Sequence, residues 1–124
     1  MNKIVKGLVI AGTLGASLMA FTRTADAKDK DGNIVIVIDP GHGGEDPGSL
    51  ATTGATESKC NYAIAEVMKK ELSKYDGVKV YLTREEDTWM TNMGRAMIAA
   101  DLNADFLISI HNNSGSDSNT GALA

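Results

Sequence analysis

Both histidines of this 124-residue chain follow a short apolar run of the kind that forms a buried strand. His42 comes after residues 34–39, and His111 comes directly after residues 106–110. In an open α/β sheet the ligand crevice forms outside the carboxyl ends of the strands, so two parallel strands could present both imidazoles to one point. Glu57 stands at the start of the first predicted helix, after a loop that leaves the same edge. The sequence therefore favours one cluster of two imidazoles and a carboxylate.

Such a cluster is a three-ligand set suited to zinc, with a fourth position left open for water. Zinc would lower the pKa of that water towards ~7 and polarise a substrate carbonyl, which indicates metal-assisted hydrolysis of an amide or ester. The alternative for each histidine is a structural hydrogen bond, and for Glu57 it is a favourable interaction with the helix dipole. For Asp39, Glu45 and Asp46 the alternative is a solvated position in the loop.

The glycine-rich loop at residues 39–44 could also belong to a phosphate-binding site or an esterase, but the other motifs of those sites are missing from the sequence. Neither G-x-G-x-x-G nor G-x-x-x-x-G-K-[ST] is present, which argues against a phosphate cradle. No G-x-S-x-G nucleophile elbow exists, which excludes an esterase of that type. The net charge of −4 argues against nucleic-acid binding. The single cysteine, Cys60, excludes an intramolecular disulfide, and we predict it to be a small buried side chain rather than a nucleophile.

The elements that would position these residues alternate between strand and helix. Strands are predicted at residues 34–38, 78–83 and 106–110, and helices at residues 57–75 and 88–102. Connections of this length predict right-handed parallel crossovers and an α/β fold. The first helix has apolar residues at three- and four-residue spacing, which predicts a face packed in the core. These are Cys60, Ile64, Val67, Met68, Leu72 and Tyr75, and the second helix carries Met90, Met93, Met97 and Ile98.

The first 27 residues are predicted to be a secretory signal peptide. Lys3 and Lys6 precede an uncharged apolar stretch at residues 7–21, and Ala25 and Ala27 supply the small-x-small cleavage pattern. The apolar stretch is shorter than the ~20 residues that cross a bilayer, so we expect cleavage and no stable membrane anchor. We predict a charged lead-in at residues 28–33 and the domain at residues 34–124, in which residues 114–124 form a polar surface loop or the start of a further element.

Two long motifs resemble those of the zinc-dependent N-acetylmuramoyl-L-alanine amidases (amidase type 3) of bacterial cell-wall hydrolysis. They are residues 36–48 (IVIDPGHGGEDPG) and 106–113 (FLISIHNN), and residues 82–87, Arg95 and Ala104-Asp105 follow the family's order between them. The resemblance implies a twisted, mainly parallel sheet with flanking helices and His42, Glu57 and His111 as zinc ligands. It also implies hydrolysis of the amide between N-acetylmuramic acid and L-alanine in peptidoglycan, in the cell wall or periplasm.

The chain departs from the family pattern in two respects. Ala100 stands where the family usually has Asn. The family domain also continues with a strand, a helix and a segment bearing a glutamate thought to act as general acid and base. We expect that glutamate to lie beyond Ala124, so no catalytic residue is identified and residues 34–124 are expected to be a C-terminally truncated domain. The alternatives are a domain that binds metal or peptidoglycan without turnover, and a secreted zinc hydrolase of another amide or ester.

Overall fold

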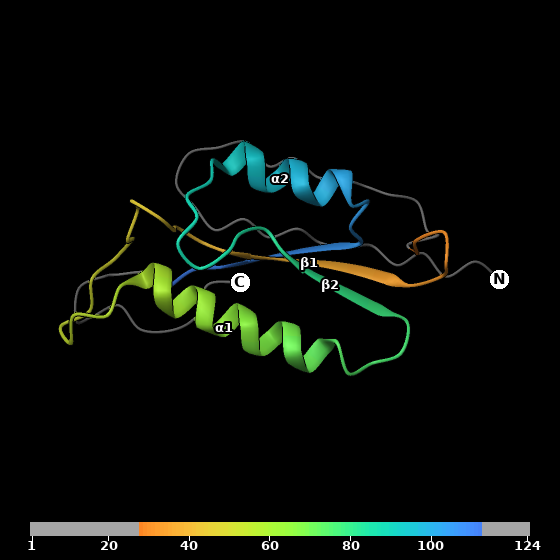
Figure 1. Ribbon diagram of the computed structural model, residues 1–124, viewed down its shortest axis with the longest axis horizontal. Coiled ribbons are helices and arrows are strands. Elements are labelled where there is room, and N and C mark those ends of the chain that lie inside the picture. The colour runs from red at the N-terminus through yellow and green to blue at the C-terminus, as the bar shows by residue number, and fades with distance from the viewer. Residues whose placement is uncertain (1–27, 113–124) are drawn as a thin grey trace, which may run out of the picture.

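The computed structural model describes residues 28–112, in which strands and helices alternate along the chain (Figure 1). The elements are β1 (Ile34–Pro40), α1 (Glu57–Leu72), β2 (Val78–Leu82), α2 (Asn92–Asp101) and β3 (Phe106–Ile110). Their order confirms the predicted α/β fold. The predicted signal peptide and the loop at 114–124 lie outside the described residues. Among residues 28–112, no helix combines the length and apolar character that spanning a membrane requires.

The three strands form a parallel sheet in the order β2-β1-β3. The central strand, β1, places Ile38 opposite Leu82 of β2, and its last residue, Pro40, opposite Ile110 of β3. Strands β1 and β3 therefore end side by side and point the same way. The residues that follow them, which include both histidines, leave the sheet at one edge.

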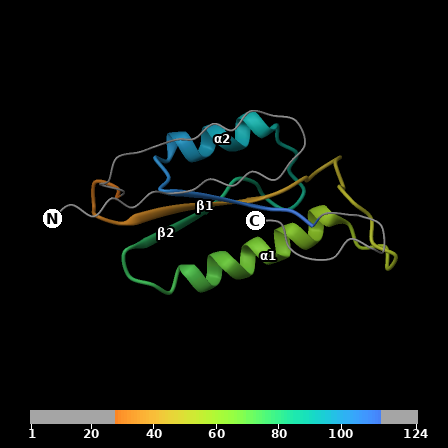
Figure 2. The same ribbon diagram turned by 180° about the vertical axis from the view of Figure 1, so that it is seen from behind.

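Helix α1 covers one face of the sheet and α2 lies over the other (Figures 1 and 2). The chain steps from β1 to β2 through α1, and then from β2 past β1 to β3 through α2. Because the two crossovers run in opposite directions, connections of the same hand place their helices on opposite faces. Strand β1 is thereby enclosed on both sides, as predicted, and Val37 and Ile38 are fully buried.

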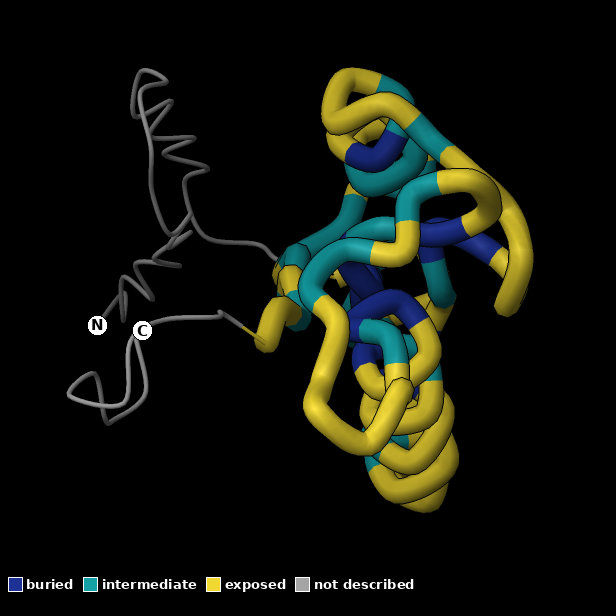
Figure 3. Tube along the Cα trace, turned by 90° about the vertical axis from the view of Figure 1, so that its left-hand side faces the viewer, coloured by how far each residue is buried: buried dark blue, intermediate teal, exposed yellow. Residues whose placement is uncertain are grey.

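The face of α1 that packs against the sheet differs from the predicted one. Its buried residues are Glu57, Ser58, Asn61 and Ala65, with Met68 and Leu72 partly buried against the core. Cys60, Ile64, Val67 and Tyr75 are exposed, so the prediction of a buried Cys60 was wrong, and the helix ends before Tyr75. Two of these polar residues bond to the adjoining loop, since Glu57 accepts from the backbone N–H of Ser49 and Asn61 donates to the carbonyl of Gly41. Figure 3 shows that the buried positions lie mainly in the interior of the described part of the chain and that the outward-facing parts of the helices and loops are exposed.

Helix α2 begins at Asn92, four residues later than predicted. Thr91 is its N-cap, and the Thr91 hydroxyl accepts a hydrogen bond from the backbone N–H of Gly94 at 3.0 Å. Met93 and Met97 of this helix are exposed, and its buried residue is Arg95. A buried carboxylate of β1 binds Arg95, and this ion pair turns that side of α2 inward.

Candidate metal centre

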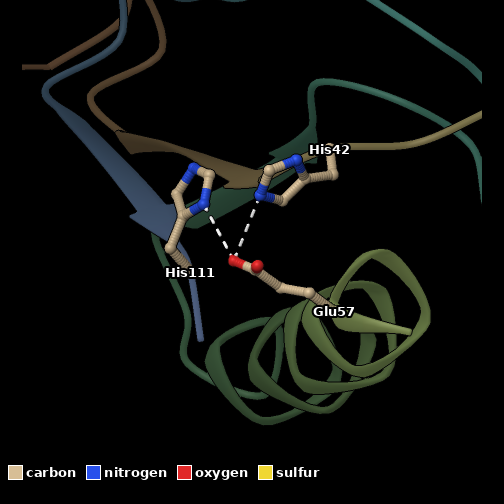
Figure 4. A group of neighbouring side chains, drawn as sticks. All are labelled: His42, Glu57 and His111. Atoms are coloured by element: carbon tan, nitrogen blue, oxygen red, sulfur yellow. Dashed lines mark hydrogen bonds and ion pairs between the residues drawn. The ribbon is translucent and has the colours of Figure 1, made fainter. Parts of the chain in front are cut away.

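The loop between β1 and α1 holds His42 in the left-handed backbone conformation, with φ 61°. Gly43 follows with φ 129°, and backbone hydrogen bonds in both directions between Gly43 and Asp46 close the turn. Glycine adopts positive φ with little strain, which is how this sequence permits so sharp a turn after the strand. The turn directs the imidazole of His42 towards the first turn of α1 (Figure 4).

His42, Glu57 and His111 converge as the sequence analysis anticipated (Figure 4). One carboxylate oxygen of Glu57, Oε1, lies 3.2 Å from His42 Nε2 and 3.1 Å from His111 Nδ1. The potential ligand atoms of all three residues lie within 4.8 Å of one another. The two imidazoles come from the ends of neighbouring strands, and the carboxylate comes from the helix that follows the first of them.

These distances suit a metal ion bound between the three side chains. Two ligand atoms at zinc's usual bond lengths in a tetrahedral site lie about 3.3 Å apart. The observed 3.2 Å and 3.1 Å separations are close to that value. Nitrogen and carboxylate donors also match the donor preference of zinc. The described residues therefore hold a possible metal-binding group.

Glu57 is set up to be anionic in this position. Its side chain is only 5% exposed, and burial by itself raises the pKa of a carboxyl group. Hydrogen bonds from the backbone N–H groups of Ser49 and Asn112, together with His111, outweigh burial and lower the pKa of Glu57 to about 2. A buried carboxylate held ionised between two imidazoles provides the negative charge that a cation requires.

Two glycines leave the space that the site needs. A Cβ added at Gly41 would overlap the imidazole ring of His111. A Cβ at Gly48, which has φ 63°, would lie 2.6 Å from the His42 ring and 2.8 Å from a carboxylate oxygen of Glu57. Real side chains do not approach this closely, so both positions require glycine for the ligands to sit where they do.

Two buried arginines fix the backbone on which His42 stands. Arg84 donates to the carbonyl oxygens of Pro40, Gly41 and Ser58. Arg95 donates to the carbonyl oxygens of Pro40 and His42 and forms a 2.8 Å ion pair with Asp39. Planar guanidinium groups with five donors suit such multiple contacts.

The carboxylate that pairs with Arg95 is itself fully engaged. Asp39 is 5% exposed and also accepts hydrogen bonds from the hydroxyl groups of Thr83 and Ser109. Asp39 is thus not the solvated loop acid that the sequence allowed. Through Thr83 and Ser109 it joins the ends of β2 and β3 to β1.

Sequence reasoning found the three clustered residues and missed most of their supports. Arg84, which lies between the strand predicted at residues 78–83 and the helix predicted at residues 88–102, has a buried side chain. Asn61 was not singled out, although it donates to the Gly41 carbonyl and accepts from the Asn112 side chain. Glu45 is exposed, as a loop acid would be, but Asp46 contacts His42. The signal that could have indicated a buried Asn61 is its position, as an uncharged polar residue, among the apolar residues of the predicted helix.

The sequence model of the N-acetylmuramoyl-L-alanine amidase family matches residues 36–124. Among curated relatives, the chain is similar to the amidase AmiC of Escherichia coli O6:H1, with 38% identity over 66% of this chain and 20% of the relative. It is also similar to the sporulation-specific N-acetylmuramoyl-L-alanine amidase of Bacillus subtilis, with 40% identity over 66% of this chain and 32% of the relative.

Two solved structures resemble the described fold. The catalytic domain of the amidase CwlV from Bacillus (Paenibacillus) polymyxa gives a TM-score of 0.66 at 34% identity, over 70% of this chain and 49% of that one. An N-acetylmuramoyl-L-alanine amidase from Clostridium difficile 630 gives 0.67 at 37% identity, over 72% and 48%. The chain thus spans a third or less of these two curated relatives and about half of these solved chains.

Proposed function

Because the chain belongs to the N-acetylmuramoyl-L-alanine amidase family, we propose that it takes part in zinc-dependent hydrolysis of the amide between N-acetylmuramic acid and L-alanine in peptidoglycan. The observation that carries the proposal is the convergence of His42, Glu57 and His111 on one point. The proposed catalytic domain is residues 34–124, as far as the chain extends. The three converging residues are its proposed metal ligands.

Each of the three side chains has a separate task in this proposal. His42 Nε2, His111 Nδ1 and Glu57 Oε1 hold the ion, and the charge of Glu57 partly neutralises it. Zinc, when bound, supplies a Lewis acid that polarises the scissile carbonyl. The Glu57 side chain is only 5% exposed, which shields its charge from water.

The proposed location is outside the cytoplasmic membrane, in the cell wall or periplasm, where peptidoglycan lies. The predicted signal peptide at residues 1–27 supports this location. The proposed partner is therefore a muropeptide-containing polymer.

Dye release from labelled, purified cell walls tests the proposal. The assay uses the purified protein, both as the 124-residue chain and extended through any downstream coding sequence, with and without a chelator. Mass spectrometry of the products should show a new free amine on L-alanine. We expect chelator-sensitive release that zinc restores. Release that persists without metal, or none from any form of the protein, would contradict the proposal.

A matched pair of variants on α1 links any activity to the site. Glu57→Gln removes the buried charge between the imidazoles and should abolish release and zinc binding. Glu66→Gln changes an exposed glutamate of the same helix and should leave both unchanged. Equal activity in the two variants would exclude Glu57 as a metal ligand.

A further inference from the structure

We propose that Asp46 is a positioning residue for His42. Its carboxylate holds the imidazole with the proton on Nδ1, and thereby turns the Nε2 lone pair towards Glu57 and His111. This inference rests on the proposed metal site, but it concerns a residue outside the three ligands. It assigns to Asp46 a task that differs from both metal ligation and proton transfer to substrate.

The inference rests on a short contact between His42 and Asp46, and further hydrogen bonds hold Asp46 in place. His42 Nδ1 lies 2.8 Å from Asp46 Oδ2, while the opposite ring nitrogen, Nε2, lies 3.2 Å from Glu57 Oε1. The second carboxylate oxygen, Asp46 Oδ1, accepts a hydrogen bond from the backbone N–H of Gly48 at 3.1 Å. Paired backbone hydrogen bonds with Gly43, at 2.9 Å and 3.1 Å, hold the Asp46 backbone as well. Although the side chain is half exposed, its direction is therefore defined from both ends.

The contact with Asp46 affects which ring nitrogen of His42 carries the proton. A neutral imidazole has one donor and one acceptor nitrogen, and an ionised carboxylate only accepts. Because Asp46 Oδ2 faces Nδ1 at 2.8 Å, a neutral His42 donates through Nδ1, and its Nε2 lone pair faces the Glu57 carboxylate. The Nε2 lone pair and the Glu57 carboxylate are both acceptors, and a cation bound between them stabilises this arrangement.

His111 is positioned by different means. Its Nδ1 faces Glu57, and no carboxylate among residues 28–112 contacts its other ring nitrogen. Its ring instead packs over Gly41 and meets the His42 ring edge to face, with centroids 4.9 Å apart and an interplanar angle of 78°. Loss of the Asp46 carboxylate should therefore affect His42 and spare His111.

The same contacts argue against Asp46 as a free general base. One of its oxygens is committed to His42 and the other to the Gly48 backbone. Proton uptake by Asp46 would remove the negative charge that strengthens both of these bonds. Orienting a ligand requires neither oxygen to move.

Two variants and one control test the inference. Asp46→Ala removes the acceptor, Asp46→Asn retains an acceptor oxygen without the charge, and Glu45→Ala removes the neighbouring exposed acid, for which no contact with His42 is seen. The first measurement is the ¹⁵N shifts of the histidine ring nitrogens in metal-free protein at about pH 8, above the usual imidazole pKa. The second is zinc affinity by competition with a chromophoric chelator.

We expect His42 of the unsubstituted protein to carry its proton on Nδ1. Asp46→Ala should lose this preference and bind zinc about 10- to 100-fold more weakly, as losses of such supporting carboxylates do. Asp46→Asn should keep the Nδ1 proton and bind with intermediate affinity, whereas Glu45→Ala should match the unsubstituted protein. The ring-nitrogen shifts of His111 should stay constant throughout.

Two results would overturn the inference. One is an unsubstituted protein with the His42 proton on Nε2, which needs no variant and so holds even if Asp46→Ala fails to fold. The other is a folded Asp46→Ala variant that binds zinc as tightly as the unsubstituted protein. Neither readout requires turnover. A protein that binds zinc as expected but releases no dye contradicts the proposed function alone, and an active protein indifferent to Asp46→Ala contradicts this inference alone.

Discussion

Replacing Arg95 with methionine should strongly destabilise the fold. The guanidinium group is buried, with side-chain exposures of 8% for both Arg95 and its ion-pair partner Asp39. It also donates to the carbonyl oxygens of Pro40, His42 and Met90. Methionine keeps much of the side chain's apolar volume but none of its donors, so the change isolates the ion pair and its hydrogen bonds.

The expected loss of stability follows from the buried charge of Asp39, which loses its ion-pair partner. Without Arg95, the charge of Asp39 stays buried with only the hydroxyl groups of Thr83 and Ser109 as donors. Breaking a buried pair from one side typically costs about 3–5 kcal/mol. The carbonyl of Pro40 keeps a partner because Arg84 also donates to it, so it adds little. A small domain has only about 5–15 kcal/mol of stability in total, so Arg95→Met should lose a large part of it.

Urea denaturation followed by far-UV circular dichroism measures this loss. The control is Lys74→Met, which removes a 2.7 Å ion pair with Glu71 on the surface of the molecule. Both side chains of that pair are about 60% exposed, so its loss should cost well under about 1 kcal/mol. The double variant Asp39→Asn with Arg95→Met should cost less than the two single changes added together, because the partners are in contact.

A loss for Arg95→Met no larger than that for Lys74→Met would refute the reasoning. Additive losses in the double variant would refute the direct coupling of the two charges. Zinc affinity supplies a second check, because Arg95 holds the carbonyl of His42. In the folded fraction of Arg95→Met, zinc should bind more weakly than in the unsubstituted protein.

The remaining predictions concern pH, space and metal. The ammonium group of Lys79 and the hydrogen bonds from Asn33 hold the pKa of Asp29 well below its usual 3.8, so the stability it contributes is present above about pH 4 and is lost as pH falls further. Asp29→Asn should therefore flatten the fall of Tm below pH 4, and an unchanged curve would contradict this. Gly41→Ala should abolish zinc binding by displacing the His111 ring. Gly94→Ala should retain zinc binding, because the atom nearest to the added Cβ is a flexible methionine carbon at 3.1 Å. Because Gly94 lies in a helix, the change should raise the free energy of unfolding by about 0.5–1 kcal/mol. Zinc at 100 times its Kd should stabilise the protein by about 2.7 kcal/mol, reversibly with chelator, in a thermal-shift measurement.

The core of the site could be predicted because its three residues are tied to features that local sequence encodes. The apolar run at residues 34–38 is long and rich in β-branched residues, so its place at the centre of a sheet followed from composition. The lengths of the connections required parallel crossovers, and parallel strands end at one edge. His42 and His111 therefore had to lie near each other once the strands β1 and β3 proved to be neighbours.

Helix orientation could not be predicted in the same way. Apolar spacing selected Cys60, Ile64 and Val67 as the inner face of α1, whereas the structure turns Asn61 and Ala65 inward. Periodicity counts apolar side chains, but it does not count the hydrogen bonds that loops elsewhere in the chain offer to polar ones. In a domain with so small a core, those bonds decide the orientation.

The sequence by itself determined the order of strands and helices, the edge where the histidines emerge and the identity of the three converging residues. Only the tertiary structure decided which way His42 faces, that Asp46 rather than Glu45 contacts it, and that Arg84 and Arg95 are buried beneath it. For the two arginines, the physical reason is the range of the interactions. Strand and helix preferences act between residues close in sequence, whereas the Asp39–Arg95 pair and the bonds to the loop carbonyls join residues 40 or more positions apart, which meet only after the sheet has formed.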